Sequence, residues 1–178
     1  MAVDNGKVNN VSDITPDWQR EKPLRFWDPG RKLLKSIRQY QKWHEKRGLF
    51  ATIVCKICVL RHRFWSVVCG ADIPLNCKIG GGLCIPHPNG IVIHPNVEIG
   101  VNCLIHQQVT IGIKSGGGLP KIKGHVDIGA GAKILGEITL YEHALVGANS
   151  VVTHDVQSYE VVAGIPARVV KKIQPGQL

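Results

Sequence analysis

The chain lacks any long apolar run. Its most hydrophobic stretch, Ala51 to Leu60, is interrupted by Lys56 and is too short to span a bilayer. The first residues are polar and acidic, and no apolar segment of the kind that directs secretion is found there. We therefore expect a soluble, cytoplasmic protein. Its 178 residues suit one principal domain with an appendage.

A second cysteine pair at metal-ligand spacing is also missing. Cys55 and Cys58 form a lone CxxC inside an apolar, helix-like run, so we expect helix packing there and no metal. Six cysteines would suit a disulfide framework only in a small secreted protein. Cys77 and Cys103 fall at small-residue positions of the repeat described below, which predicts thiols in a core.

Acidic residues are scarce near the N-terminus. Of 22 Lys and Arg residues, 13 lie between Arg20 and Arg63, opposed only by Glu21, Asp28 and Glu45. A solvated helical face is the slightly favoured interpretation. The alternative is an anionic partner, either an acidic glycan precursor or the inner membrane surface, which leaves peripheral membrane association open. No nucleic-acid-binding motif accompanies the charge, so we expect no nucleic-acid partner.

Two helices are predicted within this basic region. Asp28 can cap the first helix, Pro29 fits its first position, and the helix should end near Gly48. A second helix should run from Leu49 to about Val68. The apolar stripe of the first helix consists of Leu33, Leu34, Ile37 and Tyr40.

A six-residue repeat occupies the chain from Ile73 onward. An aliphatic residue opens each unit, and a small or aliphatic residue follows four places later, as in Ile93 and Val97. Such a repeat is typical of a parallel β-helix, in which each short strand buries its inner face by stacking on the next coil. The other pairs include Ile73/Cys77, Ile79/Leu83, Ile85/Asn89, Ile99/Cys103, Ile105/Val109, Ile128/Ala132, Ile134/Ile138, Leu140/Ala144, Val146/Ser150 and Val152/Val156.

The repeat changes phase twice. Ile85 and Ile93 are eight residues apart instead of six, across Pro86 to Gly90. Ile111 and Ile122 are eleven apart instead of twelve, across 114–120. Segments that leave the register of a regular solenoid are where loops and functional side chains are expected.

Several segments together resemble the core of serine acetyltransferases and their relatives. This resemblance implies a left-handed parallel β-helix that assembles as a homotrimer or a dimer of trimers. It also implies acetyl transfer from acetyl-CoA to a hydroxyl at sites between subunits. We expect a helical, basic region at 1–70, the β-helix at 71–170 and a tail at 171–178. The segments are Ala71-Asp72-Ile73-Pro74, Pro86-His87-Pro88-Asn89-Gly90-Ile91-Val92-Ile93, Gln107-Gln108-Val109-Thr110-Ile111-Gly112, Pro120-Lys121-Ile122, Ile128-Gly129-Ala130-Gly131-Ala132-Lys133-Ile134-Leu135-Gly136, Val146-Gly147-Ala148-Asn149-Ser150-Val151-Val152 and Gly164-Ile165-Pro166-Ala167-Arg168.

His87 is the candidate general base. It lies in the first phase change and at the family's catalytic histidine position, and an unperturbed imidazole pKa of about 6.5 suits proton transfer near neutral pH. The resemblance implies that Asp72 orients it. Because a coil of three hexads stacks residues eighteen apart, the two-residue surplus should bring Gln107 close to His87. Gln107 and Asn89 are therefore the candidates for holding the acceptor.

The donor side rests on the resemblance as well. The family positions that cradle acetyl-CoA correspond to Gly112, Ala130, Gly131 and Ala148. Small residues let a cofactor approach the backbone closely. Lys133 and Arg168 are the candidate partners for its phosphates.

The acceptor side departs from the family. Pro86 stands where an aspartate precedes the catalytic histidine, and Gly118-Leu119 stand where an Arg-His pair precedes the Pro-Lys-Ile motif. A zwitterion needs counter-charges, so we expect a glycan or sugar hydroxyl from surface-polysaccharide biosynthesis. Serine acetylation is the alternative. A third possibility, a zinc-dependent carbonic anhydrase-like β-helix, needs three converging histidines; His87, His94 and His106 do not match its spacing, so no metal is expected.

Overall fold

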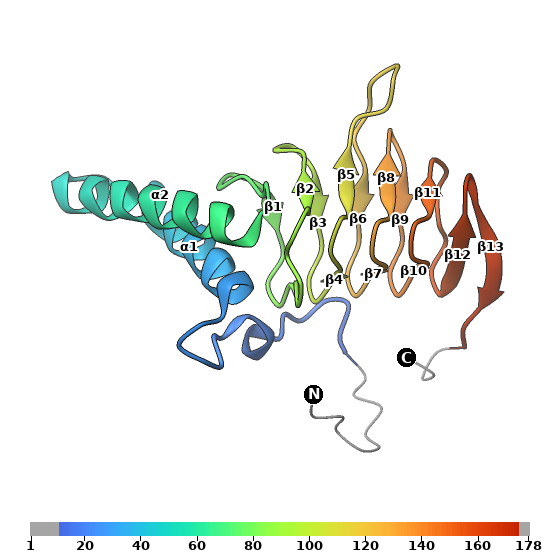
Figure 1. The fold of residues 1–178 in the computed structure, drawn as a ribbon, viewed down its shortest axis with the longest axis horizontal. Coiled ribbons are helices and arrows are strands. Elements are labelled where there is room, and N and C mark those ends of the chain that lie inside the picture. Colours follow the sequence, from blue (N-terminus) through green and yellow to red (C-terminus); the bar gives the residue numbers. More distant parts are fainter. Residues whose placement is uncertain (1–10, 175–178) are drawn as a thin grey trace.

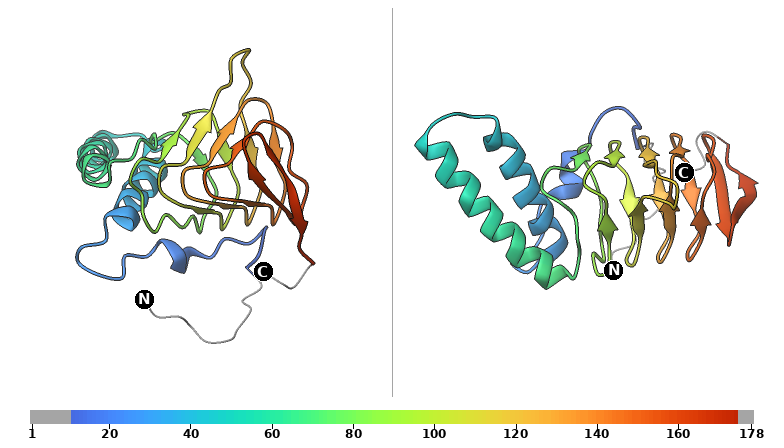
Figure 2. Two further views of the ribbon diagram at one scale, coloured as in Figure 1. Left: turned by 45° about the vertical axis from the view of Figure 1, so that its right-hand side comes forward. Right: turned by 90° about the horizontal axis from the view of Figure 1, so that it is seen from above.

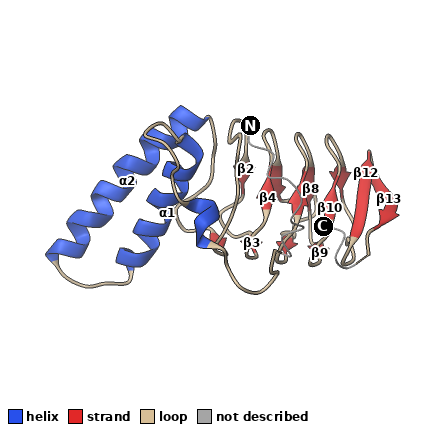
Figure 3. Ribbon diagram, turned by 90° about the horizontal axis from the view of Figure 1, so that it is seen from below, coloured by secondary structure: helices blue, strands red, loops and turns tan. Residues whose placement is uncertain are grey.

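A computed structural model describes residues 11–174, in which two helices lie side by side at one end of a stack of β-coils (Figures 1 and 3). After a short 3-10 helix, Trp18–Glu21, come α1 (Pro29–His44) and α2 (Leu49–Cys69). Both predicted helices are confirmed. The predicted cap is wrong, because the Asp28 carboxylate does not cap α1 and instead accepts a hydrogen bond from the Leu24 amide at 3.1 Å. No helix within 11–174 has both the length and the apolarity needed to cross a membrane.

Three parallel sheets form the sides of the stack, and Figure 2 shows the coils one behind another. The first sheet has the order β1-β3-β6-β9, the third has β2-β5-β8-β11, and the second joins β4, β7, β10 and β12 to an antiparallel end strand, β13. The strands are β1 (Lys78–Ile79), β2 (Val92–Ile93), β3 (Glu98–Ile99), β4 (Leu104–Ile105), β5 (Thr110–Gly112), β6 (Lys121–Ile122), β7 (Asp127–Ile128), β8 (Lys133–Leu135), β9 (Thr139–Leu140), β10 (Leu145–Val146), β11 (Val151–Val152), β12 (Glu160–Gly164) and β13 (Ala167–Lys172).

The hexapeptide residues fill the interior of the coils. Ile93, Val97 and Ile105 are at most 1% exposed, as the repeat predicts. Cys77 and Cys103 are fully buried free thiols, and burial raises the pKa of Cys77 to about 11. From β2 to β11 each of the three sheets receives every third strand, which is consistent with the predicted β-helix.

The first phase change differs from the sequence prediction in its core residue. Asn89 is exposed, whereas Ile91 is fully buried and takes the interior position that the repeat assigned to Asn89. The two surplus residues therefore lengthen the turn before Ile91. The pairing shows the same surplus, since Lys78 pairs with Glu98 twenty residues on.

The second phase change is an insertion and not a shortened pair of hexads. β5 and β6 are consecutive strands, so one hexad has gained five residues, and Glu98 pairs with Lys121 across 23 positions. The extra residues form a loop, 113–120, that projects from the coils between β5 and β6 (Figure 1). Its tip closes through a bridge between Lys114 and Gly117.

The turns between sheets stack into three edges. The His87 edge, between the second and third sheets, comprises 86–91, 106–109, 129–132 and 147–150. The loop edge, between the third and first sheets, comprises 94–97, 113–120 and 136–138. The strap edge comprises 80–83, 100–103, 123–126 and 141–144.

An N-terminal strap, residues 12–21, covers the strap edge and runs below the coils in Figure 1. The Asn102 side-chain amide donates to the carbonyl oxygens of Ser12 and Thr15, at 2.7 Å each, and accepts from the Asp17 amide at 2.7 Å. Of the three edges, the His87 edge and the loop edge remain uncovered by this segment.

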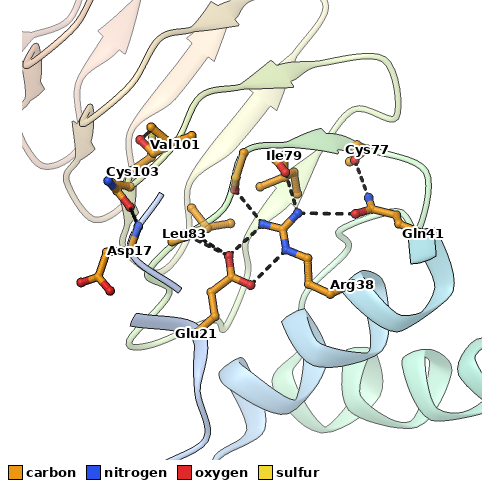
Figure 4. A network of polar contacts seen from close by, with 12 residues as sticks. Asp17, Glu21, Arg38, Gln41, Cys77, Ile79, Leu83, Val101 and Cys103 are labelled. Atoms are coloured by element: carbon orange, nitrogen blue, oxygen red, sulfur yellow. Dashed lines mark hydrogen bonds and ion pairs between the residues drawn. The ribbon is translucent and has the colours of Figure 1, made fainter. Parts of the chain in front are cut away.

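A buried ion pair fixes the helices to the first coil (Figure 4). The Arg38 guanidinium donates to the Glu21 carboxylate and to the carbonyl oxygens of Ile79 and Gly80, at 2.6 to 3.0 Å. The same carboxylate accepts from the amide of Leu83 at 3.1 Å. Glu21 is only 7% exposed, so it has lost most of its hydrating water. The hydrogen bonds of this network compensate the two charges for that loss.

Candidate functional site

His87 and Asp72 lie in adjacent coils at the His87 edge. The turn that holds His87 stacks on the residues before Asp72, since the Gly90 amide donates to the Gly70 carbonyl at 2.7 Å. Asp72 bridges to Val92, the first residue of β2. Both side chains are exposed, and no hydrogen bond or ion pair joins them within residues 11–174. The orienting contact between them therefore stays a prediction.

The two acceptor candidates have different surroundings. Gln107 lies on the His87 edge one coil on, and its side-chain carbonyl oxygen is buried without a hydrogen-bond partner in the described part of the chain. Asn89 is engaged, because its side-chain oxygen accepts from the Gln108 side-chain amide at 2.9 Å. The backbone pairs these residues too, with the Gln108 amide donating to the Asn89 carbonyl at 2.9 Å.

Gln108 is a contact that the sequence prediction missed. The stacking arithmetic considered only Gln107, whereas the side-chain amide of its neighbour Gln108 contacts Asn89, 19 residues earlier. The Gln108 side chain also fills the space beside Gly90, where an added Cβ would lie 2.6 Å from it. Gly90 has φ +70°, and Gln108 itself has φ +63°. The glycine at position 90, eighteen residues before Gln108, was the sequence signal available there.

Three of the small donor-side residues lie on the His87 edge in the later coils. The Gly131 amide donates to the Gln107 carbonyl at 2.8 Å, and the Asn149 amide donates to the Ala130 carbonyl at 2.7 Å. Ala148, beside Asn149, is exposed. His87, Gln107, Ala130, Gly131 and Ala148 therefore belong to one column of turns.

Gly112 lies away from that column, at the far end of the third sheet. It ends β5, where the chain enters the projecting loop. An added Cβ would meet only the Cβ of His94, at 3.9 Å, so no protein atom requires a glycine there.

The two phosphate candidates are not equally available. The Lys133 ammonium donates to the Gln108 carbonyl at 2.7 Å and to the Thr110 hydroxyl at 3.1 Å, so the chain itself already holds it. Arg168 is exposed on β13 and lines a hollow of ≈ 280 Å³ near the last coil. Within β13 it pairs with Ala163 of β12, beyond the last turn of the column.

The altered acceptor positions occupy two edges. Pro86 is exposed on the His87 edge. Gly118 and Leu119 lie on the loop edge, at the base of the projecting loop, and line a hollow of ≈ 540 Å³ with Glu137 and Lys121. Within one chain the loop and His87 therefore face different sides of the stack.

Two histidines form a pair on the strap edge. The Nδ1 atoms of His125 and His143 lie 2.7 Å apart, and the His143 ring stacks on Tyr159 with centroids 4.6 Å apart. Burial lowers the pKa of His125. Both have positive φ and are 18 residues apart, the spacing of stacked turns.

Metal-binding side chains do not gather in the described chain. Within 11–174, no group of three His, Cys, Asp or Glu side chains is arranged to hold a metal ion.

No family model matches the chain. The serine acetyltransferase of Haemophilus influenzae is 34% identical over 163 residues, covering 90% of this chain and 61% of the relative. That of Staphylococcus xylosus is 37% identical over 139 residues, covering 75% of this chain and 60% of the relative. The chain thus spans about three fifths of the length of these relatives.

Solved structures give the same result. A serine acetyltransferase in complex with CoA superposes with a TM-score of 0.66 at 35% identity, covering 81% of this chain and 57% of the other. Soybean serine acetyltransferase complexed with serine gives 0.67 at 34% identity, covering 80% and 57%. In both sequence and fold, most of this chain is therefore similar to the hexapeptide-repeat part of serine acetyltransferases.

Proposed function

We propose that the protein is an acetyl-CoA-dependent O-acetyltransferase, an acyltransferase enzyme. The observation that carries the proposal is the His87 edge, where an exposed imidazole stands in one column with the small residues Ala130, Gly131 and Ala148. A related protein with this fold has been solved in complex with CoA. The proposal extends to this chain an activity named for relatives of which it spans about three fifths.

His87 acts as the general base. Its neutral imidazole takes the proton of the acceptor hydroxyl while the oxygen attacks the thioester carbonyl, and the CoA thiolate leaves and recovers a proton. Asp72, in the adjacent coil, holds the ring and stabilises its charged form, as in a catalytic dyad. Gln107 offers its unpartnered carbonyl oxygen to a donor on the acceptor.

The donor lies along the His87 edge with its pantetheine arm against backbone. Ala130, Gly131 and Ala148 let it approach closely, and Gly112 does the same at the far end of the third sheet. Arg168 is the exposed cation for its phosphates. Lys133 serves this role only if it leaves its two partners in the chain.

The acceptor that the comparisons favour is L-serine. The sequence predicted a sugar of surface-polysaccharide biosynthesis, but the relatives reported above bear the name serine acetyltransferase. A sugar hydroxyl remains the second candidate because Pro86, Gly118 and Leu119 supply no counter-charges for a zwitterion.

We further infer a left-handed β-helix that forms a homotrimer, or a dimer of trimers, from a helical region at 1–70 and coils at 71–170. The strap covers one edge, so the two uncovered edges are available to meet between neighbouring chains. Such a contact brings the loop edge of one chain to the His87 edge of the next. Residues 175–178 of the predicted tail lie outside the described residues.

The deciding experiment measures thiol release from acetyl-CoA with purified protein and a panel of acceptors. L-serine at saturating concentration should release CoA, and the product should be O-acetylserine by mass spectrometry. Release with nucleotide sugars or glycans, and none with serine, would establish the second candidate. Absence of release with every acceptor would contradict the proposed activity.

A further inference from the structure

An apolar stripe runs along the outer face of α2. Its side chains recur at intervals of three and four residues, so they share one side of the helix. The residues that α2 buries, Ala51, Cys58, Trp65 and Cys69, recur at intervals of seven and then four and lie on the opposite side. The stripe is 47% to 82% exposed and consists of Phe50, Ile53, Ile57, Leu60, Phe64 and Val67.

The length and composition of this stripe exceed what scattered surface apolar residues provide. A helix of 21 residues extends about 30 Å, and two phenylalanines and four aliphatic residues follow it nearly from end to end. Continuous exposed apolar patches of this kind mark an interaction surface. In Figure 3, α2 extends past the coils, so the sheets do not cover it.

Basic side chains flank the stripe. Residues 46–70 contain five Lys or Arg and no Asp or Glu. Lys56 and Arg63, which are exposed, lie along one border of the stripe, and Lys46 and Arg47 are exposed at its N-terminal end. The face is therefore both apolar and positively charged.

The charge selects among possible occupants. A second copy of α2 would bring the same positive groups against these, with no carboxylate from 46–70 to neutralise them. An anionic bilayer supplies negative headgroups for the flanks and an apolar interior for the stripe. Beside the stripe lies an apolar hollow of ≈ 470 Å³, lined by Tyr40, Cys55, Lys56, Val59 and Leu60, so a basic group adjoins apolar space as a phospholipid requires.

We propose that α2 docks the protein in plane on an anionic phospholipid membrane, with its apolar stripe inserted at the headgroup boundary and Lys56 and Arg63 among the headgroups. This inference does not depend on the acetyltransferase activity. The membrane is a partner for the basic N-terminal region whichever molecule accepts the acetyl group.

Vesicle sedimentation of the full chain tests the proposal. Wild-type protein should sediment with vesicles of equal phosphatidylcholine and phosphatidylglycerol, and only weakly with phosphatidylcholine alone. Ile57→Glu/Phe64→Glu should reduce the bound fraction about tenfold or more, and Lys56→Glu/Arg63→Glu should do so in a salt-dependent way. Circular dichroism should show unchanged folding, because these side chains are exposed.

Matched controls distinguish binding through this face of α2 from effects of net charge or of exposed apolar residues in general. Lys123→Glu/Lys171→Glu changes the net charge equally at exposed sites on the coils and on β13, and Val170→Glu charges an exposed apolar residue on β13. Both should bind like wild type. Equal loss in these controls, equal binding to neutral vesicles, or no binding by wild type would overturn the proposal. A fall in solution mass by light scattering for the stripe variant would overturn it in favour of a second copy.

Discussion

At the scale of single residues, His87 is exposed and makes no hydrogen bond within the described chain, so its removal should affect chemistry and not folding. We expect His87→Ala to lower acetyl transfer by about 10²- to 10⁴-fold, the range for loss of a general base. His44→Ala, an exposed histidine on α1, should keep wild-type turnover. The rate of CoA release measures both, and near-normal turnover by His87→Ala would exclude it as the base.

Two glycines should respond differently to an added methyl group. Gly112→Ala meets nothing closer than 3.9 Å, so its stability should be unchanged, while KM for acetyl-CoA should rise if the donor approaches this backbone. Gly100→Ala places a Cβ 2.5 Å from the carbonyl carbon of Lys123 in the next coil, which should cost about 2 kcal/mol. Urea unfolding and KM measurements distinguish them. An unchanged KM in Gly112→Ala would remove Gly112 from the donor site.

At the scale of elements, the link between α1 and the first coil depends on Arg38 and Glu21. Arg38→Met leaves a carboxylate that is 7% exposed without its counter-charge, and we expect a loss of about 3 kcal/mol in the free energy of unfolding. Lys78→Met breaks a pair whose side chains are 75% and 50% exposed, so its effect on the free energy of unfolding should be much smaller. Urea unfolding compares the two. Equal losses in the free energy of unfolding would show that the buried pair stabilises the fold no more than the exposed pair does.

The histidine pair on the strap edge gives a pH dependence of stability. Burial, then the nearby His143 and Arg20, lowers the pKa of His125 below 6.5, so the unfolded chain binds the proton more readily. The stability that neutral His125 contributes is therefore fully present above about pH 6.5 and is lost as pH falls through the pKa of His125 in the folded protein. His125→Asn, which suits φ +53°, should flatten the pH slope of the urea midpoint between pH 7.5 and 5.5. Burial raises the pKa of Asp127, which gives the free energy of unfolding the opposite dependence on pH. The Asp127→Asn variant, measured in the same way, shows how much of the slope comes from Asp127. An unchanged slope in His125→Asn would contradict the assignment.

The elements that the sequence predicted correctly are those whose local pattern decides the structure. The hexapeptide positions and both helices follow from periodicity, because burial repeats with the backbone geometry. The errors lie where a turn changes length. The six-residue count assigned Asn89 to the interior, but the apolar side chain of Ile91 fills that position. The same count did not reveal the five-residue insertion before Lys121. A count of residues does not show where surplus residues leave the coil.

At the scale of the whole molecule, the candidate site is divided between edges. His87 lies on one edge, whereas the projecting loop, with Gly118 and Leu119, lies on another. Sequence periodicity could place each residue on its edge but could not join the edges, since that requires a second chain. The proposed trimer joins them, because a threefold arrangement brings the loop edge of one chain against the His87 edge of its neighbour.

Mixed trimers test this arrangement directly. Chains with His87→Ala and chains lacking residues 115–118 should each be inactive as pure trimers. When equal amounts are unfolded together and refolded, a site is intact only if a chain with His87 meets a neighbour with the loop. For random assembly this holds at about a quarter of sites, so about a quarter of wild-type turnover should return. If His87 and the loop acted within one chain, no mixture would regain activity. If the deleted chain were active alone, the loop would not belong to the site.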